Sequence, residues 1–144
     1  PDDQAVRVSK SCSPVRGEEM VGFVTRGRGI SIHRTDCINI ISLPEDERNR
    51  LIEAEWQNDE KKAGEKYLTE IKIYCTNRVG MFTEITKVFT ERQINIDSVN
   101  SRPDKQGNAT IDMSFEIAGK EELRQLTNKL RSIEGVIDIK RSMG

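Results

Sequence analysis

Hydrophobic and polar positions alternate with a period of two in two long stretches of the chain, residues 68–75 and 109–119. This pattern is typical of β-strands that bury one face and leave the other face to solvent. The residues expected to face the core are Ile71, Ile73 and Cys75 in the first stretch and Ala109, Ile111, Met113, Phe115 and Ile117 in the second. Both stretches are therefore expected in a sheet with one apolar and one polar surface.

Two other stretches carry hydrophobic residues at helical spacing, which predicts one amphipathic helix over 80–92 and a second around 123–133. Their inward residues are Phe82, Ile85, Val88 and Phe89 in the first helix and Leu123, Leu126, Leu130 and Ile133 in the second. Further strands are predicted at 94–101 and 135–141, with a hairpin connection at 102–108. The order β-α-β-β-α-β is the ferredoxin-like arrangement, with two helices on one face of a four-stranded antiparallel sheet.

The N-terminal part is shorter and less regular. Residues 5–12 predict one strand, and residues 20–34 predict two strands joined by a glycine-rich turn, "RGRG", at the tip. Ser42 and Glu45 have the spacing of a capping box, which predicts a short helix that begins there. In "LIEAEW" the apolar residues also alternate, so we favour a returning strand over a continuation of that helix.

A polar stretch rich in Glu and Lys separates the two patterns. We expect a first module over residues 1–57, a linker over 58–66 and a second module over 67–144. The first module offers few residues for a core, so a metal or a docked neighbour is expected to support it.

Composition narrows the possible partners. The 144 residues are 35% hydrophobic and 33% charged, and the net charge of −1 favours no partner by bulk electrostatics, so any nucleic acid contact must come from a local patch. No apolar run approaches the roughly 20 residues of a membrane span, and we expect no membrane contact. The N-terminus shows neither Met nor a targeting pattern, which suggests a fragment of a larger protein.

The three cysteines are too few and too odd in number for a disulfide framework, which favours a reducing compartment and a cytoplasmic location. Cys12, His33 and Cys37 offer the thiolate and imidazole ligands that suit zinc, although structural zinc sites normally have four ligands. The alternative is that both cysteines are small buried thiols and His33 is an ordinary strand residue. Cys75 is expected to be a core residue.

Basic side chains gather in the first module and could form one face. They are Lys10, Arg16, Arg26, Arg28 and Arg34. The arginine fork suits phosphate oxygens, and glycines let a backbone approach RNA closely. The alternative is a solvated hairpin tip. The "GRG" segment lacks the spacing of a Walker or dinucleotide-binding loop.

The segment "CSPVRGEEMVGFVTRGRGISIHRTDCINI" closely resembles the C-terminal region of long RelA/SpoT-type (p)ppGpp synthetase/hydrolases. The resemblance covers about residues 5–144. It implies that the first module is a zinc-finger or ribosome-inter-subunit (RIS) domain and that the second is an ACT domain. The expected fold class is therefore α+β, with a small β-rich zinc-finger-like module before a ferredoxin-like ACT domain.

In that family a Cys-Cys pair falls on Ser11 and Cys12, and the remaining ligands fall on His33 and Cys37. Ser11 is the departure, because it leaves three of the four ligands and implies weaker zinc binding, with water or Asp36 in the fourth position. The resemblance also places this module near ribosomal RNA and tRNA. That context favours RNA contact by the basic residues over a solvated tip.

The turn "NRVGM" matches the ACT family's turn between first strand and first helix. A ligand carboxylate is expected to meet this turn, Asn77, Arg78, Val79, Gly80 and Met81, where helix N–H groups are free. An α-amino group is expected to meet Asn95 and Asp97. The resemblance implies a homodimer through the sheets with a small, branched-chain amino acid at the interface. The alternative is a ferredoxin-like domain without a ligand.

The sequence shows no catalytic constellation, since the single histidine has no nucleophile partner and the family's catalytic motifs belong to upstream domains. We therefore expect a non-enzymatic regulatory fragment of a GTP pyrophosphokinase or (p)ppGpp hydrolase of the stringent response. It would dock on ribosome-bound tRNA and rRNA and sense an amino acid. The alternative is an amino-acid-binding ACT module of a metabolic enzyme with no RNA role.

Overall fold

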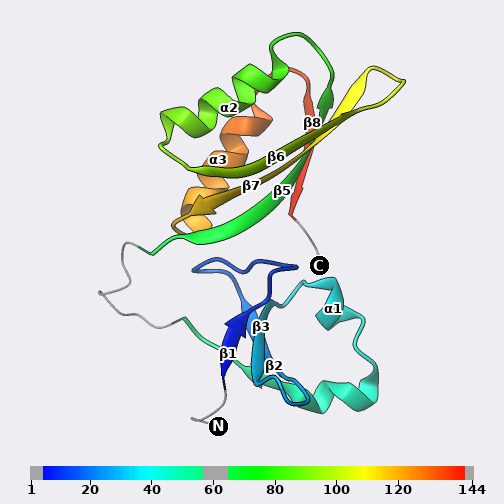
Figure 1. The fold of residues 1–144 in the computed structure, drawn as a ribbon, viewed down its shortest axis with the longest axis vertical. Helices are drawn as coiled ribbons and strands as arrows, with labels where there is room; N and C mark the ends of the chain where they lie inside the picture. The colour runs from blue at the N-terminus through cyan, green and yellow to red at the C-terminus, as the bar shows by residue number, and fades with distance from the viewer. Residues whose placement is uncertain (1–4, 57–64, 142–144) are drawn as a thin grey trace.

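The computed structural model describes residues 5–56 and 65–141 and shows two modules, one above the other in Figure 1. Each module is built on its own four-stranded sheet, with strand orders β1-β3-β2-β4 and β6-β7-β5-β8. Of the linker predicted at 58–66, only residues 65 and 66 fall within the described residues. The mixed α+β class expected from the sequence is confirmed.

The first module pairs β1 in parallel with β3, while β2 runs antiparallel to both β3 and β4. Its strands are β1 Val6–Val8, β2 Met20–Val24, β3 Ile30–Arg34 and β4 Leu51–Glu53. The two strands around the "RGRG" turn and the returning strand are therefore confirmed. A small core lies under this sheet, where Cys12, Cys37 and Ile40 are buried.

The capping box expected at Ser42 and Glu45 is wrong. Ser42 ends a short helix, α1 (Ile38–Ile41), and its hydroxyl donates a hydrogen bond back to the Ile38 carbonyl at 2.6 Å. A 3-10 helix, η1 (Glu45–Arg50), follows and begins after Pro44 without a side-chain cap. Proline fixes φ and is well tolerated where a helix opens, so η1 begins after it although no side chain caps the first amides.

The second module has the ferredoxin-like order and topology predicted from the sequence. Its elements are β5 Tyr67–Thr76, α2 Met81–Glu91, β6 Ile96–Pro103, β7 Asn108–Ile117, α3 Lys120–Arg131 and β8 Val136–Arg141. Both helices lie on one face of the sheet (Figure 1). All eight inward residues predicted on the two alternating strands are buried.

The inward face of α2 is shifted by one position at its N-terminal end. Phe82, expected in the core, is 48% exposed, and Met81 is buried in its place. The helix begins directly after Gly80, so the buried residues Met81, Ile85 and Val88 follow the spacing i, i+4, i+7. In α3 the predicted leucines are buried, and Ile133 packs against the core beyond the end of the helix.

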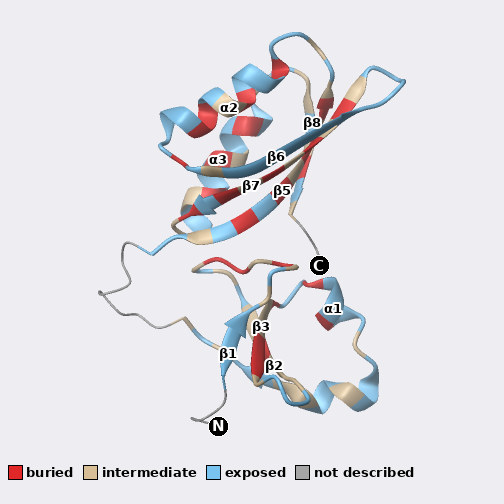
Figure 2. Ribbon diagram, viewed as in Figure 1, coloured by how far each residue is buried: buried red, intermediate tan, exposed pale blue. Residues whose placement is uncertain are grey.

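A loop of the first module completes the core of the second. Val15 is fully buried within the hydrophobic cluster of the second module, and Figure 2 shows the loop that carries it as a buried stretch between the two sheets. The Lys120 amide donates to the Arg16 carbonyl at 2.7 Å. The Trp56 ring of the first module lies edge to face with the Tyr67 ring of the second, with the two centroids 5.3 Å apart. The modules are therefore packed together and not only joined by a linker.

Among the described residues, none of the helices has the length and apolar character needed to cross a bilayer.

Candidate metal centre and ligand-binding surfaces

The structure brings Cys12, His33 and Cys37 together. Their ligand atoms all lie within 4.8 Å of one another, and His33 Nδ1 lies 3.7 Å from each cysteine Sγ. A tetrahedral zinc with ordinary Zn–S and Zn–N bonds would separate such atoms by about 3.6 Å. The three side chains therefore fit a zinc ion, with both thiols buried.

Three separate segments position these ligands. Cys12 follows β1 in a turn, His33 lies on β3, and Cys37 immediately precedes α1. The other ring nitrogen of His33, Nε2, lies 2.9 Å from Ser31 Oγ. A hydrogen bond to the ring nitrogen that does not bind the metal fixes the orientation of the imidazole and directs the opposite nitrogen toward a metal. Ser31 and His33 share a face of β3 because they are two residues apart in a strand.

The fourth ligand position is not filled by a cysteine. The Ser11 hydroxyl lies 2.8 Å from Ser9 Oγ and accepts a hydrogen bond from the Asn39 amide at 3.4 Å. Asp36 is ion-paired with Arg34, with 3.1 Å between Oδ1 and Nε. Neither group belongs to the Cys-His-Cys cluster, so the described residues bring three candidate ligands for a metal together.

The tip of the β2–β3 hairpin exposes Arg26 and Arg28. Thr25 closes the turn, since its amide and its hydroxyl both donate to the Gly29 carbonyl, at 2.9 and 2.6 Å. Gly29 has a φ of +77°, and a Cβ there would lie 2.1 Å from the Ala5 carbonyl oxygen. Position 29 requires glycine because the backbone there passes close to Ala5, the residue before β1. No such close approach occurs at Gly27.

The five basic residues of the first module do not share one exposed face. Lys10, Arg26 and Arg28 are exposed, but Arg34 is only 2% exposed. Arg16 lies at the junction with the second module, where its carbonyl accepts the Lys120 amide. Arg34 was expected on this basic face, but the folded chain buries it.

The turn between β5 and α2 is held in place by Arg78. Its guanidinium donates to the Glu134 carbonyl at 3.1 and 2.8 Å and is ion-paired with Glu84. Val79 is 99% exposed, and Gly80 adopts a left-handed φ of +85°. The Met81 amide already donates to the Arg78 carbonyl at 3.2 Å, and the Asn77 amide donates to the Gly107 carbonyl at 2.8 Å. In the described part of the chain, the amides of Val79 and Gly80 are left for a ligand.

Asn95 and Asp97 lie at the other end of the sheet. Ile96 pairs with Phe115, which pairs with Thr69, and β5 continues for seven more residues to Thr76 before the turn. That length of strand spans about 23 Å. One chain therefore does not bring the two halves of the expected amino acid site together.

Cys75 is a core residue, as expected. Its thiol is fully buried and lies 3.7 Å from the Ala109 carbonyl oxygen. Burial raises the pKa of the Cys75 thiol above its ordinary value, and the nearby Arg78 opposes that shift only in part. The thiol is therefore protonated and unreactive at neutral pH.

Sequence reasoning missed two further groups of residues. Glu18 and Arg141 form an ion pair between the modules, and no local pattern could have linked residues so distant in sequence. Helical spacing also relates three basic residues of α3, Lys120, Arg124 and Arg131. This spacing can be read from the sequence in the same way as that of the hydrophobic residues of the helix.

Both modules match known domain families. Residues 1–57 match the RelA/SpoT RIS domain, and residues 63–141 match the ACT domain. This chain belongs to the RelA/SpoT family. The Cys-His-Cys cluster and the basic hairpin tip thus lie in its RIS domain, and the β5–α2 turn lies in its ACT domain.

The relatives that align with this chain are much longer proteins. The "GTP pyrophosphokinase" of Escherichia coli (strain K12) is 36% identical over 138 residues, which are 95% of this chain and 18% of that protein. The "Bifunctional (p)ppGpp synthase/hydrolase RelA" of Mycobacterium tuberculosis is 33% identical over 135 residues, or 94% of this chain and 18% of the relative. The chain therefore spans about a fifth of the length of these relatives.

The ACT domain also resembles solved structures. A crystal structure of the ACT domain from the GTP pyrophosphokinase of Chlorobium tepidum is 28% identical, with a TM-score of 0.48, and it covers 53% of this chain and 97% of that one.

Proposed function

We propose that this chain is the regulatory region of a GTP pyrophosphokinase or (p)ppGpp synthetase/hydrolase of the stringent response. The observation that carries the proposal is the succession of a RIS domain and an ACT domain in a chain that aligns over 95% of its length with a GTP pyrophosphokinase. The chain spans only 18% of that protein, so we assign catalysis to other domains of the parent protein. The chain would relay a starvation signal to them.

The RIS domain is proposed to dock on ribosomal RNA and tRNA through its hairpin tip. Arg26 and Arg28 are exposed there, and the Arg26 guanidinium has one carboxylate partner, Glu47, at 3.5 Å. An exposed ion pair with this N···O separation is weak, so phosphate oxygens can replace the Glu47 carboxylate as the partner of Arg26. Lys10 adds an exposed positive charge, whereas the buried Arg34 does not contribute.

Ribosome docking is tested in the parent protein with the double variant Arg26→Ala/Arg28→Ala. Co-sedimentation with ribosomes at near-physiological salt is expected to weaken, and each lost phosphate contact should lower the log–log salt slope by about 0.7 to 0.9. The matched control is Arg48→Ala/Arg50→Ala, which removes the same charge from η1. Equal sedimentation of the tip variant and the wild type would leave the tip as a solvated turn.

Zinc is proposed as the occupant of the Cys-His-Cys cluster. Two buried thiolates and one imidazole suit zinc better than harder cations such as Mg²⁺ or Ca²⁺. When bound, the ion would supply a structural crosslink between the turn after β1, strand β3 and helix α1, which otherwise share only a small core. Water is the simplest fourth ligand, since the Ser11 hydroxyl is engaged with Ser9.

The ACT domain is proposed to bind a branched-chain amino acid at the interface of a homodimer. Strand β6 is an edge strand, and its unpaired side can template a second copy. If two β6 strands pair antiparallel, the Asp97 end of one strand meets the opposite end of its partner. That opposite end, at Pro103, is level with Ala109 and Cys75, close to the β5–α2 turn. A dimer would therefore join the two half-sites that one chain separates.

The competing function is an ACT module of a metabolic enzyme that has no RNA role. The RIS match over residues 1–57 counts against it, because such a module would need only the ACT half. Loss of ribosome binding in the tip variant, with amino acid binding unchanged, would separate the two functions.

A further inference from the structure

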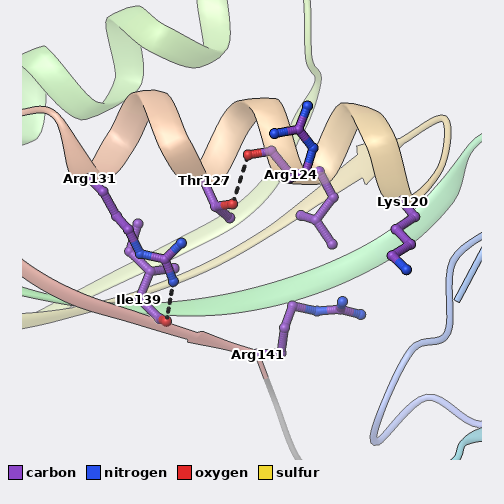
Figure 3. A pocket seen from close by; sticks show the side chains of 7 residues that line it. Lys120, Arg124, Thr127, Arg131, Ile139 and Arg141 are labelled. Carbon is purple, nitrogen blue, oxygen red and sulfur yellow. Dashed lines mark hydrogen bonds between the residues drawn. The ribbon is translucent and has the colours of Figure 1, made fainter.

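A basic groove lies between α3 and β8 of the ACT domain. It is a hollow of about 190 Å³ with an apolar floor formed by Leu123 and Ile139. Its polar lining residues are Lys120, Arg124, Thr127, Arg131 and Arg141 (Figure 3). We propose that this groove is a second RNA surface and binds the phosphate backbone. It extends the ribosome docking proposed above from the RIS domain to the ACT domain.

The polar residues of α3 that line the groove form one stripe. Successive residues of an α-helix are rotated by about 100°, so Lys120, Arg124, Thr127 and Arg131 fall within an arc of roughly 60°. This stripe borders the leucines that face the core, which places it beside β8. Lys129, in contrast, lies about half a turn from Lys120.

The groove carries a net positive charge. Arg124 is ion-paired with Glu121, and Arg141 is ion-paired with Glu18. Arg131 donates to the Ile139 carbonyl at 3.2 Å, a bond that leaves its charge uncompensated. In the described part of the chain, Lys120 forms no ion pair. Two of the four positive charges therefore have no carboxylate partner.

The existing contacts also orient the donors. The bond to Ile139 lays the Arg131 side chain along β8, as Figure 3 shows, and leaves further guanidinium N–H groups for a ligand. The Arg124–Glu121 pair is exposed, so its cost of rearrangement is small. Thr127 donates its hydroxyl to the Arg124 carbonyl at 3.0 Å and therefore adds no donor to the ligand surface.

The dimensions of the stripe favour a polymer over a compact anion. Lys120 and Arg131 are eleven residues apart, or about 16 Å along the helix axis. A single phosphate or pyrophosphate group would reach only one end of this stripe, whereas successive phosphates of a nucleic acid strand can follow it. Arginine forks also match phosphate oxygens in a bidentate geometry. The same forks pair with carboxylates, so an acidic peptide is the competitor that the test must exclude.

The test compares two charge-matched triple variants of the whole chain. The groove variant is Lys120→Gln/Arg124→Gln/Arg131→Gln. The control variant is Lys129→Gln/Lys87→Gln/Arg92→Gln, which removes the same charge from exposed positions outside the groove. Binding of a labelled RNA hairpin is measured by fluorescence anisotropy over a series of salt concentrations, with thermal unfolding to confirm that both variants fold.

The groove variant is expected to bind the hairpin at least tenfold more weakly than the control variant. Its log–log salt slope should fall by roughly 2, from two to three lost contacts at about 0.7 to 0.9 each. Equal weakening in both variants would overturn the proposal, because net charge alone would then explain the loss. Displacement of the RNA hairpin by tripolyphosphate or by a poly-glutamate peptide, added at the same total negative charge as the RNA, would also overturn the proposal.

The tip variant Arg26→Ala/Arg28→Ala, measured in the same assay, separates this inference from the proposed function. A groove variant that loses hairpin binding while the tip variant keeps it supports the groove and counts against the tip. The reverse result supports the tip and overturns the groove.

Discussion

Arg141, at the end of β8 in the second module, forms an ion pair with Glu18 in the loop of the first module. The two guanidinium Nη atoms contact the two carboxylate oxygens, and Nη2 also donates to the Ser13 carbonyl at 3.0 Å. Both side chains are 17% exposed. The pair connects the loop that starts at Cys12 of the Cys-His-Cys cluster to the sheet of the ACT domain.

The first prediction concerns this ion pair. Glu18→Gln should lower the free energy of unfolding by about 1–3 kcal/mol, because it leaves the partly buried Arg141 without its carboxylate. Urea unfolding measures the change. Glu121→Gln breaks an exposed pair and serves as the control, with a much smaller expected loss. A Glu18→Gln variant as stable as the control would show that the pair contributes nothing to the junction.

The second prediction concerns the hairpin tip. Gly29→Ala combines a left-handed φ with a Cβ 2.1 Å from the Ala5 carbonyl oxygen, so β1 must move away. Gly27→Ala has a similar φ of +87° but no heavy atom within 4 Å. We expect a loss of about 1 kcal/mol for Gly27→Ala and a distinctly larger loss for Gly29→Ala. Thermal unfolding that ranks the two variants in the opposite order would contradict the close approach seen here.

The third prediction concerns metal binding. Cys37→Ser should remove most of the zinc affinity and destabilise the first module, since one of three ligands is lost. Ser11→Cys should raise the affinity by supplying a fourth ligand. Competition with a chromophoric chelator measures both variants, and Cys75→Ser is the control thiol outside the cluster. Unchanged zinc content in the Ser11→Cys variant would show that residue 11 does not reach the metal.

The fourth prediction concerns pH. Burial raises the pKa of Cys75 above 9.0 in the folded protein, so the native state holds its proton more tightly than the unfolded state. The resulting stability is fully present below pH 9 and is lost as the pH rises through the folded-state pKa. Cys75→Ala should therefore show a flatter decline of unfolding free energy above pH 9 than the wild type. Parallel declines in the two proteins would refute the shifted pKa.

The fifth prediction concerns the amino acid site. Gly80→Val should block the β5–α2 turn by bulk and by strain at a φ of +85°, and Asp97→Ala should remove the partner of the ligand amine. Each variant alone should give no heat with valine or isoleucine in titration calorimetry. Mixed dimers of the two variants should regain one intact site, because one turn and one strand of each interface remain unaltered.

The mixed-dimer experiment has its own control. A mixture of Asp97→Ala with wild type reports how readily subunits exchange. If exchange occurs and the two single variants still fail to complement each other, the turn and the strand do not belong to a shared site. No heat from a folded wild-type dimer would count against ligand binding altogether.

The sequence by itself determined the fold of the second module. Its alternating strands and amphipathic helices bury enough apolar surface that each periodicity matches its element, and Phe115 and Leu126 lie in the core as predicted. It also pointed to Cys12, His33 and Cys37, which the fold brings together, because thiol and imidazole groups are chemically distinctive. In the first module, short strands with few apolar residues left the pattern weak, and the helix start near Ser42 was misplaced by its capping-box spacing.

Only the tertiary structure decided which of these residues meet. Arg34 was expected on an exposed basic face, yet it is only 2% exposed, and its Nε lies 3.1 Å from Asp36 Oδ1. Gly80 and Asp97 looked like parts of one site, yet the strand register holds them at opposite ends of the sheet. Val15 lies in the loop of one module but packs in the core of the other. Periodicity reports which face of an element is apolar, whereas contacts between distant segments depend on register and packing, which no local pattern encodes.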